Sequence, residues 1–198
     1  MVFDLQVGVL ALQGDVSEHL HAFDSLGVKA ISVRRVGDLE KSDALVIPGG
    51  ESTTISELMQ SSGLFEKTCE LALGGFPVWG TCAGAILLAS KGDSQVRKTG
   101  QALLNLMQMQ INRNAFGRQR ESFEAQLNFK FSGKGFDFPG IFIRAPSIER
   151  VWGNCKAVAF HGKKIVAAVQ GNLFATAFHP ELTGDGRIHE FFLEECCP

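Results

Sequence analysis

Cys82 is the side chain in this sequence best placed to act as a nucleophile. It stands in Gly80-Thr81-Cys82-Ala83-Gly84, between an apolar run that predicts a buried strand and a segment that predicts a helix. Such a turn presents the nucleophile in a strained conformation, and the glycines leave room for the adjoining strand and helix. Unpaired N–H groups at a helix start favour a thiolate, and the N–H of Ala83 can face a developing oxyanion. A cysteine packed in the core of the turn is the alternative interpretation.

A base for this nucleophile is offered by His179-Pro180-Glu181. Pro180 favours an extended conformation at His179, and residues two apart in an extended segment project to the same side. Glu181 can then fix the imidazole tautomer and stabilise the imidazolium, as the third member of a nucleophile-base-orienter set. A capped strand end with a solvated histidine and glutamate has the same sequence. We expect the remaining histidines to lie at the surface without a catalytic role: His19, His21, His161 and His189.

The third element is the glycine-rich segment 48–54, Pro-Gly-Gly-Glu-Ser-Thr-Thr, which follows an apolar run. Glycine amides can approach a substrate closely and stabilise an oxyanion. The segment is not a Walker loop because no Lys-Ser or Lys-Thr follows the glycines. An ordinary glycine-rich turn into a helix is the competing interpretation. Together with Cys82 and His179-Glu181, however, the segment supplies the parts needed for acyl transfer through a thioester.

These residues must be positioned by strands and helices that alternate in the first half of the chain. Short apolar runs predict strands over 7–12, 28–33, 44–47 and 76–79. Each strand is followed by a segment with helical periodicity, which is the pattern of βαβ units. We expect Asp15 to cap the first helix and Thr54 and Glu57 to form a capping box at another. The segment 85–90 predicts a further helix after Cys82.

Beyond about residue 100 the pattern changes to that of antiparallel strands. Apolar and polar residues alternate from Phe123 to Phe131, as in a half-buried strand. Gly162-Lys163 and Gly171-Asn172 predict hairpin turns, and a last helix is expected from about Arg187. The chain shows no linker and no internal repeat. We therefore expect one α/β domain over residues 1–198, with a mixed central sheet and helices on both faces.

Composition excludes several classes of function. The 198 residues carry 19 basic and 21 acidic side chains, a net charge of −2, so no electrostatic surface for nucleic acid or an anionic membrane is expected. The start of the sequence does not have the pattern of a secretory signal, and no apolar run is long enough to span a membrane. The five irregularly spaced cysteines suggest neither a disulfide framework nor a zinc site. These features predict a cytoplasmic protein.

The motifs "PGGEST", "GTCAG" and "HPE", in this order, resemble those of the Cys-His-Glu glutamine amidotransferase family. The longer segments "LALQGDVSEHL", "NRNAFGRQRESFEA", "FIRAP" and "FHPELTGDGRIHEFF" resemble the glutaminase subunits of two-protein pyridoxal 5'-phosphate synthases, over nearly the whole chain. The resemblance implies a three-layer, flavodoxin-like fold of the class I glutamine amidotransferases. The sequence departs from the family's pattern around 91–101, near 129–138 and in the tail 196–198, away from these motifs.

The resemblance also implies a role for individual residues. Cys82 would be the nucleophile, His179 the general base and acid, and Glu181 the residue that orients it. The residues expected to contact L-glutamine are Gly50, Glu51, Ser52, Arg113, Ile143 and Arg144. Those expected at the oxyanion hole are Gly49, Gly50, Ala83 and Gln13, the last when the partner docks. A guanidinium such as that of Arg113 or Arg144 is a natural partner for the glutamine carboxylate.

The implied reaction is hydrolysis of L-glutamine to L-glutamate and ammonia, with no metal and no organic cofactor. The implied partner is a (β/α)8 synthase subunit that receives the ammonia, in an assembly of twelve copies of each subunit; pyridoxal phosphate is then a product of the assembly. Two alternatives stay open. The chain could serve a different synthase, whose glutaminases lack the "NRNAFGRQ" and "FIRAP" segments, or it could be a non-catalytic regulatory subunit that retains the fold.

Overall fold

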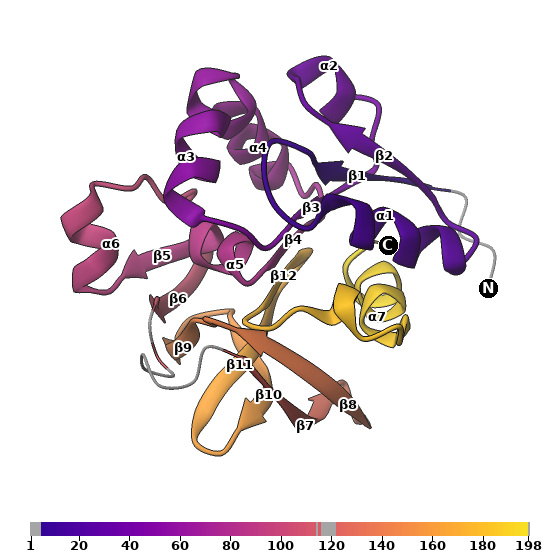
Figure 1. Ribbon diagram of the computed structural model, residues 1–198, viewed down its shortest axis with the longest axis vertical. Coiled ribbons are helices and arrows are strands. Elements are labelled where there is room, and N and C mark those ends of the chain that lie inside the picture. The colour runs from indigo at the N-terminus through magenta and orange to yellow at the C-terminus, as the bar shows by residue number, and fades with distance from the viewer. Residues whose placement is uncertain (1–4, 114, 116–121, 198) are drawn as a thin grey trace.

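The computed structural model describes residues 5–113, 115 and 122–197, and its centre is a mixed β-sheet (Figure 1). The main path of the sheet has the order β2-β1-β3-β4-β12-β11-β10-β7-β8, and β5, β6 and β9 form a branch from β11. The strands of the first half are β1 (Gln6–Leu10), β2 (Lys29–Val33), β3 (Ala44–Ile47), β4 (Val78–Thr81) and β5 (Ala89–Gly92). Those of the second half are β6 (Met107–Asn112), β7 (Ser122–Phe131), β8 (Lys134–Ile143), β9 (Ser147–Val151), β10 (Lys156–His161), β11 (Lys164–Gln170) and β12 (Leu173–Thr176).

Helices cover both faces of the parallel part of the sheet, which confirms the predicted layered α/β fold (Figure 1). On one face, α1 and α7 bury Phe23, Ile188 and Phe192 against Val7 and Trp79. On the other face, α3, α4 and α5 pack over strands β1, β3 and β4. The helices are α1 (Val16–Ser25), α2 (Val36–Leu39), α3 (Ser52–Ser61), α4 (Leu64–Leu73), α5 (Ala83–Leu88), α6 (Ser94–Thr99) and α7 (Arg187–Cys196), with a 3₁₀ turn η1 (Pro180–Leu182).

The antiparallel part follows the predicted hairpins. The turns at residues 162–163 and 171–172 join β10 to β11 and β11 to β12, as expected from the two glycines. In β7, Leu127 and Phe129 point into the core while their neighbours are exposed, and the strand pairs with β8 along its whole length. The alternation of apolar residues therefore predicted this strand correctly.

Two local predictions were wrong. Helix α3 does not begin at a Thr54 capping box but at Ser52. Glu51, directly after the glycines, is the N-cap residue, because its carboxylate accepts hydrogen bonds from the N–H groups of Thr53 and Thr54. The segment 85–90 is not helical throughout. Helix α5 ends at Leu88 because Ala89 is extended and pairs with Met107 of β6.

The candidate residues come together where the sheet changes from parallel to antiparallel pairing, at β12. Strand β12 is parallel to β4, with Thr176 opposite Thr81, and antiparallel to β11 on its other side. The carboxyl ends of β4 and β12 therefore lie side by side, one leading to Cys82 and the other to His179. Ligands of open α/β sheets bind outside the carboxyl ends of the strands. In the described residues, no helix has the length and apolar character needed to cross a membrane.

Candidate active site

The chain turns sharply at Cys82, as the sequence predicts. Cys82 has φ 46° and ψ −98°, a strained conformation for a residue with a side chain, and its N–H donates to the carbonyl of Thr176 at 2.8 Å. A Cβ at Gly80 would lie 2.3 Å from the carbonyl carbon of Gly84, and one at Gly84 would lie 2.0 Å from the carbonyl oxygen of Ile47. The two glycines are therefore required for the turn. They hold the thiol at the start of α5, where it is mostly buried.

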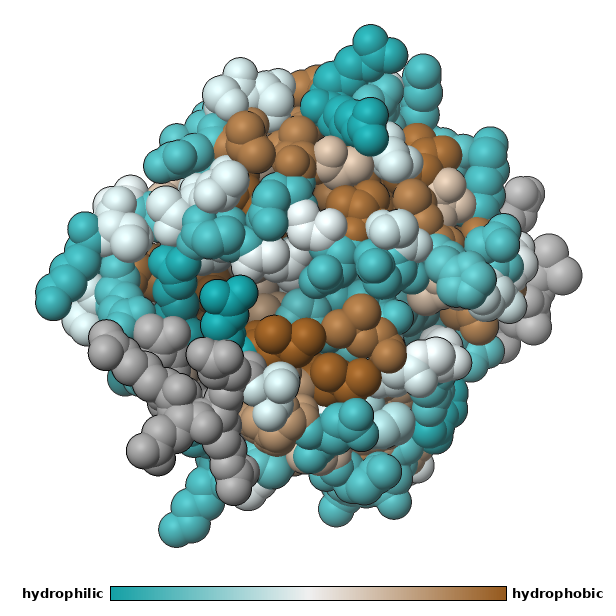
Figure 2. Space-filling view, viewed as in Figure 1, coloured by the Kyte–Doolittle hydropathy of each residue, from teal (hydrophilic) through white to brown (hydrophobic). Residues whose placement is uncertain are grey.

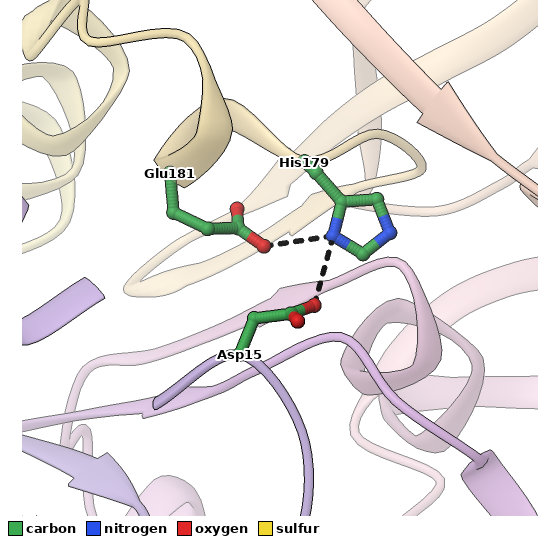
Figure 3. Close-up of side chains that lie close together, drawn as sticks. All are labelled: Asp15, His179 and Glu181. Carbon is green, nitrogen blue, oxygen red and sulfur yellow. Dashed lines mark hydrogen bonds and ion pairs between the residues drawn. The ribbon is translucent and has the colours of Figure 1, made fainter. Parts of the chain in front are cut away.

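His179 follows β12 and is held by its backbone and by its ring. Its N–H donates to the carbonyl of Ile141 at 2.8 Å, and its Nδ1 lies 2.8 Å from Oε1 of Glu181 on η1 (Figure 3). The side chain of Glu181 is fully buried, so the solvated arrangement does not apply. Because Nδ1 faces the carboxylates, Nε2 is the nitrogen left to exchange a proton with Cys82, which lies close enough to raise the pKa of His179. The three residues are thus arranged as nucleophile, base and orienter.

A second carboxylate, which the sequence analysis assigned only to a helix cap, also reaches this imidazole. Asp15 stands at the N-cap position of α1 but makes no capping hydrogen bond. Instead its Oδ2 lies 3.2 Å from Nδ1 of His179, so that this nitrogen faces the carboxylates of both Asp15 and Glu181 (Figure 3). The ligand atoms of Asp15, His179 and Glu181 lie within 4.8 Å of one another, a set of donors that suits a divalent cation. A shared Nδ1–H hydrogen bond accounts for the same geometry.

The electrostatics of the site favour a charged imidazole. Burial by itself would lower the pKa of His179, but hydrogen bonds to Asp15, Cys82 and Glu181 outweigh it and raise the pKa to about 12. Burial raises the pKa of Glu181, while the contact with His179 acts in the opposite direction. An imidazolium flanked by two carboxylates can hold a thiolate opposite it and can donate a proton to a leaving group.

Two of the histidines expected at the surface are buried behind the triad. His19 of α1 and His189 of α7 are both inaccessible to solvent, and His19 Nε2 lies 3.4 Å from Oε2 of Glu181. The amphipathic pattern of α1 gave no sign of this, because a histidine facing the core has the same spacing as one facing water. The expectation of a surface role for these two residues is therefore wrong.

The glycine-rich segment lies directly against the base. A Cβ at Gly49 would be 2.3 Å from Cε1 of His179, and Gly50 has φ 155°, with a Cβ position 2.4 Å from Oε1 of Gln13. The side chain of Gln13 crosses this turn, where its Oε1 accepts a hydrogen bond from the N–H of Glu51 at 2.8 Å. The segment and the loop after β1 are thus in contact.

A cavity of about 410 Å³ lies above Cys82, at the mouth that these loops surround. Ten of the twelve residues predicted for the site line it: Gln13, Gly50, Glu51, Ser52, Cys82, Ala83, Arg113, Ile143, Arg144 and His179. The other two, Gly49 and Glu181, lie behind His179. The cavity also contacts Gly14, Asp15, Ile86 and Pro146, which were not predicted. Its size suits a single amino acid.

The polar wall of the cavity is already organised. Burial would raise the pKa of Glu51, but hydrogen bonds from Thr54 and Thr53 and the nearby Arg113 lower it to about 2. Arg113 contacts the Glu51 carboxylate with one guanidinium nitrogen and Thr53 Oγ1, at 3.2 Å, with another. Ser52 lines the cavity as well, and its hydroxyl donates to Gln101 at 3.0 Å. This hydrogen bond ties the cavity wall at Ser52 to the segment that follows α6.

Arg144 and Ile143 form the opposite side of the mouth. Arg144 has φ 43°, so the backbone turns sharply after β8, and the carbonyl of Ile143 lies 3.9 Å from Sγ of Cys82. The Ile143 side chain is partly exposed, and Figure 2 shows hydrophobic residues gathered near the middle of this face of the molecule. Of the motif that runs from Arg113 to Arg118, residues 114 and 116–118 lie outside the described residues.

Comparisons with known proteins identify the family of this chain. The model of the SNO glutamine amidotransferase family matches residues 9–198. Among curated proteins, a pyridoxal 5'-phosphate synthase subunit PdxT of Thermococcus onnurineus is 50% identical, covering 96% of this chain and 98% of its own, and one of Archaeoglobus fulgidus is 49% identical, covering 96% and 98%. A crystal structure of a glutamine amidotransferase is 43% identical with a TM-score of 0.88, covering 96% of this chain and 98% of that one. The chain therefore belongs to the SNO glutamine amidotransferase family.

Proposed function

We propose that this chain is the glutaminase subunit of a pyridoxal 5'-phosphate synthase, a single domain that hydrolyses L-glutamine to L-glutamate and ammonia. One observation carries the proposal. Cys82 and His179, the latter hydrogen-bonded to Glu181, line a cavity of amino-acid size in a chain half identical to proteins named as subunits of that synthase. An intact triad also argues against a non-catalytic regulatory subunit.

The reaction runs through a thioester. The Cys82 thiolate attacks the carboxamide carbon of glutamine, and the C–N bond breaks as His179 gives its proton to the nitrogen, which leaves as ammonia. Water then enters, His179 takes one of its protons, and the resulting hydroxide displaces the thiolate to release glutamate. Glu181 and Asp15 stabilise the imidazolium during the first step. Every proton that the imidazole gives in the first half is recovered in the second.

The charged groups at the mouth suit the rest of the substrate. Glutamine carries a carboxylate and an ammonium, and Arg113 and Arg144 offer guanidinium groups to the first of these. The carboxylate of Glu51, ionised at all but the most acidic pH, suits the second. Because Arg113 contacts Glu51 without substrate, glutamine would add its carboxylate to an existing ion pair, which fixes the guanidinium in place before binding.

The oxyanion of the tetrahedral intermediate would be held by backbone N–H groups of Gly49, Gly50 and Ala83. Gly50 and Ala83 line the cavity with Cys82, Gly49 lies against the His179 ring, and the glycines allow close approach. Gln13 contributes indirectly, since its side chain accepts from the N–H of Glu51 and so fixes the loop that presents the glycines. Docking of a partner against the loop after β1 would act on the same contact.

The partner in this proposal is a (β/α)8 synthase subunit, twelve copies of it with twelve of this chain, in the cytoplasm. Free ammonia in neutral water becomes ammonium and loses its nucleophilicity, so the product must pass directly to the partner. No metal and no organic cofactor has a role in these steps. A glutaminase of another synthase is the second candidate, but the names of the relatives favour the first.

The test is ammonia release from L-glutamine by the purified chain, with and without a pyridoxal phosphate synthase subunit. Cys82→Ala serves as the blank, and Cys155→Ala as the matched control, because burial raises the pKa of the Cys155 thiol to about 11 and it lies outside the site. We expect activity that the synthase increases, that Cys82→Ala abolishes and that Cys155→Ala retains. Activity without stimulation would reject this partner, and a fully active Cys82→Ala would reject the mechanism.

A further inference from the structure

Behind the triad lies a second, fully buried pair of imidazoles that the reaction described above does not use. His19 comes from α1 and His189 from α7, and neither is accessible to solvent. Nδ1 of His19 lies 3.0 Å from Nε2 of His189. On its other side, Nε2 of His19 lies 3.4 Å from Oε2 of Glu181 and 3.3 Å from Oγ1 of Thr81, the residue before the nucleophile. The pair thus continues the triad inward.

Aromatic rings fix both imidazoles in place. His19 and His189 each meet Trp79 edge to face, with ring centroids 5.4 and 4.9 Å apart, and Phe23 meets His189 in the same way at 5.0 Å. Such contacts leave little freedom to rotate a ring within a packed core. Trp79 is itself tied down, since its Nε1 donates to Oγ1 of Thr176 at 3.1 Å. The nitrogen atoms therefore keep the directions given above.

Both imidazoles are neutral. Burial, and to a smaller extent the neighbouring imidazoles of His189 and His179, lowers the pKa of His19 well below its ordinary value. Burial lowers the pKa of His189 to about 3. Each ring therefore carries one N–H group, and the hydrogen-bond partners decide which nitrogen bears it.

Only one arrangement of these two protons satisfies the carboxylate. Oε2 of Glu181 is buried and receives no well-directed hydrogen bond from any described residue, so a lone pair of His19 Nε2 facing it would add repulsion to a missing bond. Nε2 of His19 must therefore carry the proton. Its Nδ1 then accepts from Nε2–H of His189, and Nδ1 of His189, which has no partner in the described residues, keeps a lone pair. The reverse arrangement buries an unpaired N–H.

We propose that His19 is a positioning residue, which holds the Glu181 carboxylate in line with His179 as the inner member of a relay that begins at His189. In this arrangement His189 donates to His19, the Nε2–H of His19 lies between Oγ1 of Thr81 at 3.3 Å and Oε2 of Glu181 at 3.4 Å, and His179 donates to Oε1. A carboxylate that is hydrogen-bonded at Oε1 and faces the positive end of an N–H dipole at Oε2 keeps its orientation when the imidazole gives up and recovers its proton. The effect on the reaction rests on the glutaminase function proposed above.

The kinetic test compares three variants, each assayed with saturating synthase subunit. His19→Leu removes the donor, His19→Gln keeps an amide N–H, and His21→Leu is the matched control on the exposed side of the same helix. We expect His19→Leu to lower kcat about 10- to 100-fold with KM within twofold, since the buried Oε2 of Glu181 then faces no N–H group of this helix. His19→Gln should stay within about fivefold of the parent chain and His21→Leu within twofold.

Two results of the kinetic test would overturn the proposal: a folded His19→Leu within twofold of the parent kcat, or a folded His19→Gln as slow as His19→Leu. A parent chain without glutaminase activity would instead refute the proposed function. The second measurement needs no variant to fold and no activity. Correlation of imidazole ¹⁵N with ring protons in the parent chain should show both His19 and His189 protonated at Nε2. Protonation of His19 at Nδ1 would refute the relay.

Discussion

Two carboxylates share one N–H of the catalytic base, so removing one of them should be partly compensated by the other. We predict that Glu181→Gln and Asp15→Asn each reduce kcat moderately, and that the double variant loses far more than the product of the two. The reason is the tautomer. While either carboxylate remains, Nδ1 of His179 keeps its proton and Nε2 still faces Cys82.

The magnitudes follow from the two contacts. Glu181 accepts at 2.8 Å with a fully buried side chain, and a hydrogen bond to a charged group contributes about 1.5–3 kcal/mol, or about 10- to 150-fold in kcat. Asp15 is 3.2 Å away with 36% of its side chain exposed, so solvent reduces its contribution to about 0.5–1 kcal/mol, or about two- to fivefold. Their product is about 20- to 750-fold. Losing both acceptors should approach the loss of about 10⁴-fold seen when a triad loses its only carboxylate acceptor.

The assay is glutamine hydrolysis by the four chains, parent, both single variants and the double variant, at saturating synthase and glutamine. Thermal melting of each chain controls for folding. The matched control is Asp24→Asn, at an exposed position of the helix that Asp15 precedes. A double variant equal to the product of the single variants, or an Asp15→Asn more impaired than Glu181→Gln, would refute the reasoning.

Three further predictions concern the turn, the cavity and the buried histidine. Gly84→Ala should destabilise the chain by about 3 kcal/mol or more, because its Cβ would lie 2.0 Å from the carbonyl oxygen of Ile47, whereas Gly100→Ala, with φ 67° and open space around it, should cost about 1 kcal/mol; urea unfolding measures both. Arg113→Ala should raise KM for glutamine at least tenfold with a smaller change in kcat, as steady-state kinetics would show. A lower kcat with an unchanged KM would contradict a role of Arg113 in substrate binding. In the folded chain His189 has a pKa of about 3, whereas in the unfolded chain its pKa is about 6.5. Below pH 6.5 only the unfolded chain gains a proton at this residue, so the free energy of unfolding should fall as the pH drops. His189→Phe should reduce that slope by about 1.4 kcal/mol per pH unit between pH 6 and 4, in denaturant unfolding followed at several pH values, and an unchanged slope would contradict a neutral buried ring.

The parts of the site that sequence predicted well are those held by local rules. Gly80 and Gly84 mark the turn at Cys82 because no side chain fits there, and that requirement is legible in the residues themselves. The same holds for the hairpin turns and for the alternation in β7. The resemblance to a family then placed Arg113 and Ile143 at the cavity, although they follow Cys82 by 31 and 61 residues in the chain.

The parts that sequence missed depend on long-range contacts. Asp15 has the residue type and the position of a helix cap, and only the fold shows that its carboxylate contacts His179, 164 residues later in the chain. His19 has the same helical spacing whether its neighbour is water or His189. The capping box at Thr54 failed for a related reason, since Glu51, directly after the glycines, already accepts from the N–H of Thr54 that Glu57 would need.

The position of β12 in the sheet sets when the chain can become chemically competent during its synthesis. Strand β12 is inserted between β4 and β11, and the base and its orienter follow it directly, almost a hundred residues after the nucleophile. A nascent chain that still lacks residues 173–181 has its cysteine but neither an imidazole beside it nor the Thr176 carbonyl that anchors the turn. Such a chain cannot consume glutamine on the ribosome. Competence should arise in one late step, when the final strand closes the sheet.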